Sequence, residues 1–256
     1  MNLDISVHAE KIFQIGGFPV TNSLLLSIIV FLFLAITAII IRKKLSLIPN
    51  YLQNIAELII DGALNLMDSI FQDRRKSEKY LPLILTIFLF VLFSNWIGLL
   101  PGVGSIGILN GEGKYVPILR SPASDLNFTL ALALITVTLV NILGMISIGV
   151  FSRVKIFFNF KSPIKFFVGI LEFISEIAKI VSFSFRLFGN VLAGEVLLVI
   201  MVFLIPYIPP FPFLFLETFT SFFQAFVFAM LALIFVSIAV TSEEEFEDAE
   251  YVAKKV

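Results

Sequence analysis

The chain has 256 residues, of which 59% are hydrophobic and 14% charged, and its formal net charge is −1. Soluble domains are roughly 45–50% apolar and about 25% charged, so this composition predicts a polytopic membrane protein. The sequence has no Cys and a single His, at position 8, which argues against thiolate catalysis, a Ser-His triad and a histidine-built metal site. We expect an all-α membrane protein without a metal or cofactor, and its charge suggests no nucleic-acid partner.

Five apolar segments are long enough to cross a bilayer, which takes about 20 helical residues. In chain order they cover residues 24–41, 80–100, 127–151, 163–205 and 213–240, followed by an acidic tail at 241–256. The first segment has its positive charges after the apolar run, at Arg42-Lys43-Lys44, so it is a retained span rather than a signal peptide. We expect these spans to form one membrane domain over residues 1–256.

The segment 163–205 is unusually long. As one straight helix its 43 residues would extend about 64 Å, roughly twice the hydrocarbon thickness. It is therefore either one steeply tilted helix or two helices that meet near Gly189-Asn190. If it crosses once, 13 Lys and Arg lie on the cytoplasmic side and three outside; if it crosses twice, the count is 11 against five. The positive-inside rule favours one crossing, which places the N-terminus outside and the C-terminus in the cytoplasm.

Residues 51–72 differ from the spans because polar and apolar residues alternate at helical spacing. The polar stripe is Asn54, Glu57, Asp61, Asn65, Asp68 and Gln72. The apolar stripe is Leu52, Ile55, Ile59, Ala63, Leu66 and Ile70. This pattern predicts an amphipathic helix at the cytoplasmic interface, which we interpret as a packing or anchoring element without chemistry.

Charged residues inside the long segment need an explanation, since each costs about 2.5 to 3.5 kcal/mol at a helix centre on insertion scales. Glu172, Glu176 and Lys179 are mutual helical neighbours, so they can form an interfacial salt-bridge ladder. Arg186 has no acidic residue within four positions, and Glu195 faces the opposite side of the helix. The counter-charge of Arg186 must therefore come from another helix, such as Glu217, or from another subunit along an ion pathway.

The last span carries Glu217 and Gln224 on one face, seven residues apart. A carboxylate that titrates beside an amide that only hydrogen-bonds suits a proton relay, although plain helix–helix hydrogen bonding gives the same pattern. A stripe of small residues shares this span: Ser221, Ala225, Ala229 and Ala232. Such stripes allow membrane helices to approach closely, so we expect tight packing here.

The segment Ser182 to Asn190 reads Ser-Phe-Ser-Phe-Arg-Leu-Phe-Gly-Asn and is followed by Ala193-Gly194-Glu195. It resembles subunit a of the F-type ATP synthase. Three other regions are similar to the same family: Ser124-Asp125-Leu126-Asn127, Asn95 to Pro101, and Gln224-Ala225-Phe226 with Glu217. The resemblance covers residues 20–240. Some members carry His where Glu217 stands.

This resemblance implies a proton-translocating stator subunit that is not an enzyme on its own. It would sit beside a rotating ring of c subunits, whose membrane-buried carboxylates supply the counter-charge of Arg186. That arginine would keep the passing carboxylate ionised and prevent leakage between two aqueous half-channels. The residues implied for the external half-channel are Glu195, Glu217, Gln224, Asn190 and, at its mouth, Asp125. Additional candidates are Glu172, Glu176 and Lys179 towards the cytoplasm, and Asn95.

Further partners implied by the resemblance are peripheral-stalk b subunits, the remainder of the F1Fo complex and the lipid bilayer, in a bacterial plasma membrane. The alternative function is a self-contained, ion-coupled secondary transporter. Such a protein would be expected to show inverted repeats and paired broken helices, and the sequence has no convincing repeat. The two functions differ in an assay, because a transporter moves ions alone whereas subunit a conducts only with its ring. The choice of H⁺ or Na⁺ stays open.

Overall fold

The computed structural model describes residues 10–15, 18–100, 103, 106–109, 115–149, 163–204 and 210–241. The longer helices are α1 (Asn22–Lys43), α2 (Tyr51–Phe71), α3 (Arg74–Gly98), α4 (Leu126–Ile148), α6 (Pro163–Leu204) and α7 (Pro210–Val240). The remaining elements are β1 (Lys11–Ile15), β2 (Phe18–Thr21), β4 (Gly107–Leu109), β5 (Tyr115–Pro117) and the short 3₁₀ helix η1 (Pro122–Ser124). His8 and residues 242–256 of the expected acidic tail lie outside the described residues.

Five helices, α1, α3, α4, α6 and α7, are long and apolar enough to cross a membrane, which confirms the predicted fold class. The predicted boundaries differ by a few residues at most ends, chiefly because α3 begins at Arg74 rather than at residue 80. Its charged first turns continue the helix before the apolar run starts. Asp73 caps this end, since its side chain accepts a hydrogen bond from the backbone N–H of Arg75 at 2.9 Å,.

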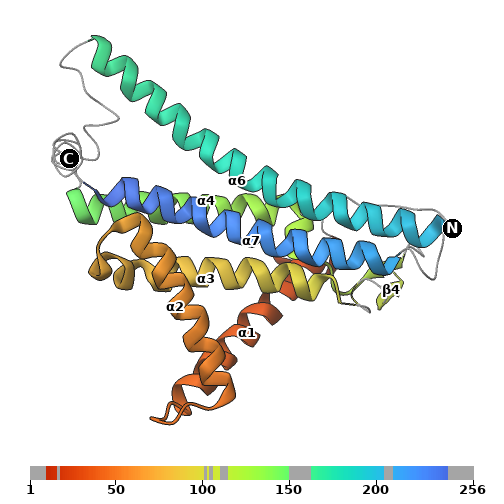
Figure 1. Ribbon diagram of the computed structural model, residues 1–256. Coiled ribbons are helices and arrows are strands. Elements are labelled where there is room, and N and C mark those ends of the chain that lie inside the picture. Colours follow the sequence, from red (N-terminus) through yellow and green to blue (C-terminus); the bar gives the residue numbers. More distant parts are fainter. Residues whose placement is uncertain are drawn as a thin grey trace.

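The long segment is one continuous helix, so the alternative of two helices meeting at Gly189-Asn190 is wrong. With 42 residues, α6 is about 63 Å long, which requires a strong tilt to match a bilayer,. Its second half runs alongside α7, whereas its first half diverges from the bundle (Figure 1). Large apolar side chains are exposed along that first half, including Phe167, Phe173 and Ile177. They face lipid or a partner chain.

The core of the bundle lies between α3, α4, α6 and α7. Helix α7 is the central element, because half of its most apolar stretch is buried, against 11% for α1. The predicted small stripe of α7 is buried at all its positions: Ser221, Ala225, Ala229 and Ala232. Close approach is also seen at Gly144 of α4, where an added Cβ would lie 2.9 Å from the carbonyl oxygen of Ala239. The expected tight packing is therefore confirmed.

Helix α2 forms as predicted, but its packing face differs from the predicted apolar stripe. The side chains buried against α3 are Leu64, Met67 and Phe71, and the Phe71 ring stacks on Tyr80 at 5.6 Å. Leu52 and Ile55 of the predicted stripe are exposed. The stripe lies next to the packed face around the helix, so it stays available to lipid or to another chain. Figure 1 shows α2 crossing the direction of the spanning helices near one end of the bundle.

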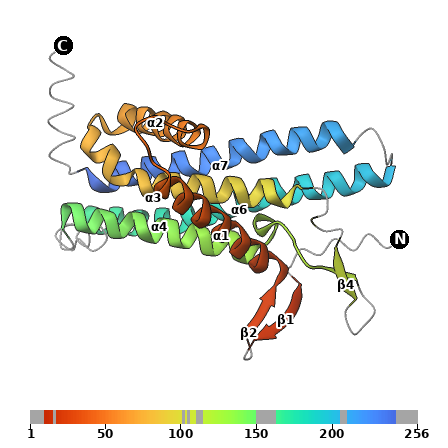
Figure 2. The same ribbon diagram turned by 90° about the horizontal axis from the view of Figure 1, so that it is seen from below.

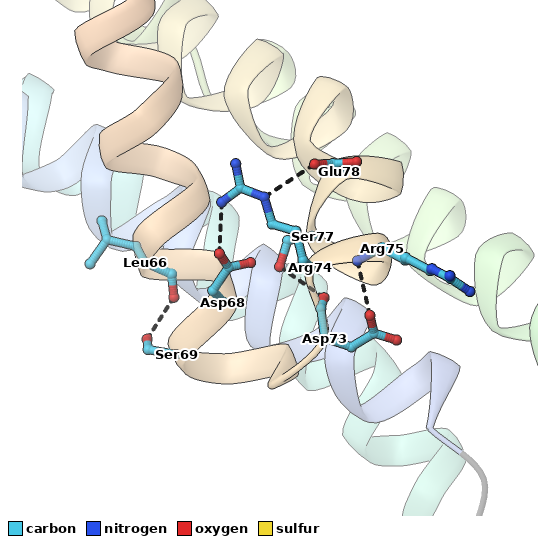
Figure 3. A network of polar contacts seen from close by, with 8 residues as sticks. All are labelled: Leu66, Asp68, Ser69, Asp73, Arg74, Arg75, Ser77 and Glu78. Atoms are coloured by element: carbon cyan, nitrogen blue, oxygen red, sulfur yellow. Dashed lines mark hydrogen bonds and ion pairs between the residues drawn. The ribbon is translucent and has the colours of Figure 1, made fainter.

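The turn between α2 and α3 is held by a network of charges, drawn in Figure 3. Arg74 donates to Asp68 at 2.7 Å and to Glu78 at 3.1 Å. The Ser77 hydroxyl and the Arg74 guanidinium hold the pKa of the Asp68 carboxyl below its usual value of 3.8. The ion pairs are at the surface, since Arg74 and Glu78 are exposed and Asp68 is half-buried, so they order the turn more than they stabilise the fold,.

The described residues form two β-hairpins, which the sequence analysis did not predict, towards the other end of the bundle (Figure 2). Strands β1 and β2 are antiparallel, as are β4 and β5. The side-chain amide of Asn22, at the start of α1, donates to the carbonyl of Pro117 in β5 at 3.3 Å, which ties the two hairpins together. We call this the hairpin end of the bundle and the opposite end, near α2, the α2 end.

Candidate functional site

The site follows the interface between α6 and α7, which run antiparallel (Figure 1). Towards the hairpin end, Gly194 of α6 contacts the carboxyl group of Glu217 in α7. Eleven residues earlier in α6, Phe183 packs against Phe228, eleven residues later in α7, with ring centroids 4.6 Å apart. These two contacts fix the register of the helices, so Asn190 lies level with Ser221, and Leu187 with Gln224.

Arg186 lies near the middle of α6 with its side chain exposed. Its Nη2 donates to the hydroxyl of Ser182, one turn earlier, at 3.2 Å. Within the described part of the chain, no carboxylate forms an ion pair with Arg186. Glu217 is buried, and the register places it about eight residues along α7 from the level of Arg186. The structure therefore does not support the intramolecular pairing with Glu217. An exposed, permanently charged group on a spanning helix needs a counter-charge from outside this chain.

The Glu217 carboxyl occupies a notch in α6 that exists only because residue 194 has no side chain. A Cβ built on Gly194 would overlap the Glu217 carboxyl group. Glu195 is the next residue of α6. Its Oε2 accepts from Nη2 of Arg120 at 3.4 Å, and the Arg120 side chain is 8% exposed. Two carboxylates and one guanidinium thus share the interface towards the hairpin end.

Buried polar atoms without a hydrogen-bond partner in the described residues gather in the same region. Seven residues carry them: Ser94, Asn95, Ser121, Asn190, Glu217, Ser221 and Gln224. They come from α3, the segment before η1, α6 and α7. Trp96, which donates to the carbonyl of Thr218 at 3.2 Å, aligns the end of α3 with this part of α7. Buried polar atoms are nearly always satisfied by protein or water, so these atoms need partners beyond the described residues, and water is one that fits.

Asp125 lies at the edge of this region, and both of its oxygens are already used. One accepts from the backbone N–H of Asn127, which caps α4, at 3.0 Å. The other accepts from the hydroxyl of Ser23 in α1 at 3.0 Å. These contacts give Asp125 a structural function in joining α1 to α4. Its expected place at the mouth of a half-channel stays a prediction.

On the α2 side of Arg186, a cavity of about 40 Å³ opens between α4, α6 and α7. This volume is enough for water. Its wall includes Glu172, Glu176 and Lys179. Glu176 accepts from Lys179 at 2.7 Å and from the side-chain amide of Asn141 at 3.0 Å. Lys179 also lies over the ring of Phe235, 4.9 Å from its centroid.

The structure thus divides the predicted site residues into two groups on either side of Arg186. Glu195, Glu217, Gln224, Asn190 and Asn95 belong to the group towards the hairpin end, and Glu172, Glu176 and Lys179 to the cavity. Two contributing residues were missed by the sequence analysis, Arg120 and Asn141. Arg120 lies in a connecting segment, and Asn141 is one polar residue in an apolar helix. Neither carries a spacing that marks it.

The chain is similar in sequence to a known protein family and to several bacterial proteins. The family described as ATP synthase A chain matches residues 23–237. A Campylobacter jejuni protein named ATP synthase subunit a is 33% identical over 219 residues, which cover 84% of this chain and 88% of the relative. The protein of the same name from Campylobacter concisus is 36% identical with the same coverage. That from Campylobacter fetus is 32% identical over 227 residues, or 88% and 92% of the two chains.

Proposed function

The chain belongs to the ATP synthase A chain family, and we propose on that basis that it is the proton-translocating stator subunit of an F-type ATP synthase. Membership of the family makes it a multi-pass membrane subunit of that complex. The proposal adds how the subunit conducts protons: through two aqueous half-channels that open on opposite sides of the membrane. Both would end at the surface that carries Arg186 and faces the ring of c subunits.

The observation that carries the proposal is the distribution of polar groups along the interface of α6 and α7. Unpartnered buried atoms on Asn190, Glu217 and Gln224 support a hydrated path from the hairpin end inwards,. The cavity lined by Glu172 and Glu176 supports a second path from the α2 end. Arg186 lies between the two along α6.

Arg186 would act on a carboxylate of the ring. Its exposed guanidinium has no acidic partner within the described residues of this chain, so the negative charge it needs is free to come from a neighbouring subunit. A fixed positive charge stabilises the ionised form of a carboxylate nearby and repels a proton. Each ring carboxylate would therefore lose its proton to one half-channel when it reaches Arg186, and gain another from the second half-channel after passing it.

In this scheme Glu217 and Glu195 would pass protons at the inner part of the external half-channel. Glu217 is buried against α6 and can hold or release a proton, while Arg120 stabilises a negative charge on Glu195,. The pair can therefore relay a proton without carrying two uncompensated negative charges.

The orientation we propose places the hairpin end outside and the α2 end in the cytoplasm of a bacterium. It follows from the excess of Lys and Arg in the segments that the sequence assigns to the cytoplasmic side, 13 against three, since α2 lies in one of these segments,. A membrane potential of 100 mV then supplies about 2.3 kcal/mol for each proton that moves inwards, which would drive rotation of the ring. The c-ring, peripheral-stalk b subunits and the remainder of F1Fo are the proposed partners.

The test is ATP-driven proton pumping in inverted membrane vesicles that carry the whole complex. We expect Arg186→Ala to abolish coupled pumping while passive proton leak persists or increases, because the barrier between the half-channels loses its charge. Arg75→Ala, at an exposed arginine in the first turn of α3, is the matched control and should pump normally. Normal pumping by Arg186→Ala would contradict the proposal. Ion transport by the chain alone would favour the secondary transporter instead.

A further inference from the structure

A compact apolar cluster separates the two polar regions inside the bundle. Phe183 of α6 packs edge-on against Phe228 and Phe235 of α7, with ring centroids 4.6 Å and 5.7 Å apart. Phe183 is 3% exposed, Phe228 1% and Leu187 0%. We refer to Phe183, Leu187 and Phe228 as the aromatic barrier.

Polar side chains lie on both sides of the aromatic barrier. Phe183 and Phe235 form part of the wall of the cavity that holds Lys179. On the other side, Asn190 and Gln224 carry buried amide nitrogens without partners in the described residues. Lys179 and Asn190 are eleven residues apart on α6, or about 16 Å along the axis. Phe183 and Leu187 lie between these two positions on α6 and are buried.

At the level of Phe183 and Phe228 the buried polar side chains satisfy each other, whereas Gln224 lies level with Leu187, at the hairpin-end edge of the barrier. Ser184 and Thr129 are both fully buried, and their hydroxyl oxygens lie 3.0 Å apart. Thr129 is also 3.1 Å from the carbonyl oxygen of Leu126. Because these groups have partners within the protein, this level needs no water, unlike the regions on either side.

Arg186 does not block a proton path through the interior of the bundle, because its side chain is exposed at the surface. A proton that moved between the half-channels through the interior, among α4, α6 and α7, would never pass the guanidinium. We propose that the aromatic barrier is an internal insulator, which prevents protons from crossing within this subunit and leaves the ring carboxylates as the only route. This inference rests on the proposed function and adds a second, separate seal to that of Arg186.

The experiment measures passive proton conductance in membrane vesicles that carry the complex without F1, driven by a potassium diffusion potential. Two rings are compared: one with its native carboxylate, and one in which that carboxylate is replaced by the neutral amide and can carry no proton. In the amide-ring complex we expect Phe183→Ser and Phe228→Ser each to raise conductance several-fold over the unsubstituted chain. Serine is chosen because it removes the aromatic side chain and offers water a hydrogen-bonding partner.

Two substitutions control for packing and assembly. Phe183→Leu keeps the barrier apolar and should stay sealed in the amide-ring complex. Phe71→Ser removes a phenylalanine that is also buried, at 9% exposure, but lies at the contact of α2 with α3, so it should stay sealed as well. Conductance is expressed per assembled complex, and the substitutions on α6 and α7 test the same barrier from two helices.

The outcomes distinguish the inference from the function on which it rests. If the unsubstituted chain does not conduct with the carboxylate ring, or conducts equally with the amide ring, the proposed function fails. If it conducts only with the carboxylate ring and the assembled serine variants stay sealed with the amide ring, the barrier assignment alone is wrong. A leak in Phe71→Ser as large as that in Phe183→Ser would also overturn it.

Discussion

Replacing Gly194 by alanine is the smallest change that acts on the proposed external half-channel. The added Cβ would overlap the carboxyl group of Glu217, so either that side chain rotates out of its notch or α6 and α7 separate. Overpacking of this kind typically costs about 1–3 kcal/mol. A reacting group displaced by about 1 Å can lose roughly a hundredfold in rate. We therefore expect proton pumping to fall between about tenfold and a hundredfold.

The assay is ATP-driven pumping per assembled complex, so that a loss of assembly and a loss of transfer are measured separately. Gly144→Ala is the packing control: its Cβ would lie 2.9 Å from the carbonyl oxygen of Ala239, which is 22 residues from Glu217, or about 33 Å along α7,. It should lower assembly but leave pumping per complex unchanged. Gly62→Ala meets no atom within 4 Å and should stabilise α2 by about 0.5–1 kcal/mol.

The reasoning fails if Gly194→Ala pumps as well as Gly62→Ala at equal assembly. That result would mean that the position of the Glu217 carboxyl does not matter for transfer. A loss of the same size in Gly144→Ala would instead attribute the effect of Gly194→Ala to general helix separation.

Three further outcomes are expected. Lys179→Met leaves the largely buried Glu176 without its cation and should lower the stability of the detergent-solubilised complex by about 1–3 kcal/mol, as measured by thermal unfolding; an unchanged melting temperature would contradict this. Asp125→Ala removes the cap of α4 and should cost about 0.5–2 kcal/mol, while Asp125→Asn keeps most of it; equal losses in both would refute the capping function. Because the pKa of Asp68 is lowered in the folded protein, its contribution is present above the unfolded value near 3.8 and is lost as pH falls through the lower folded value. Amide protection at the turn between α2 and α3, corrected for the intrinsic exchange rate at each pH, should therefore hold from pH 6 down to about pH 4 and fall below it, and Asp68→Asn should show a smaller pH dependence,.

The spanning helices could be predicted because a bilayer requires about 20 consecutive, mostly apolar residues, which are visible in the sequence itself. The isolation of Arg186 could be predicted for a similar reason, since helical spacing alone excludes an acidic neighbour on its own helix. The continuous course of α6 was only partly predictable. Charge counting favoured a single crossing, but Gly189 within the segment left a break open, and the structure keeps the helix intact there.

The contacts that complete the two polar regions could not be predicted, because each joins residues far apart in the chain. Arg120 and Glu195 are separated by 75 positions, and Asn141 and Glu176 by 35. The side chains that α2 buries against its neighbours could not be predicted for a related reason. The hydrophobic periodicity marks which face is apolar, but the position of α3 decides which part of that face is covered, here Met67 and its neighbours.

The exposure of Arg186 has a consequence for how the complex is built. Its only hydrogen bond to a described residue is to Ser182, so in the free chain a full positive charge faces lipid, at a cost of about 2.5–3.5 kcal/mol on insertion scales. Docking against a ring carboxylate would remove that cost. On the proposed function, a copy inserted before a ring is at hand would be an unstable biosynthetic intermediate, and a cell that makes more of this subunit than of the ring should clear the surplus by proteolysis.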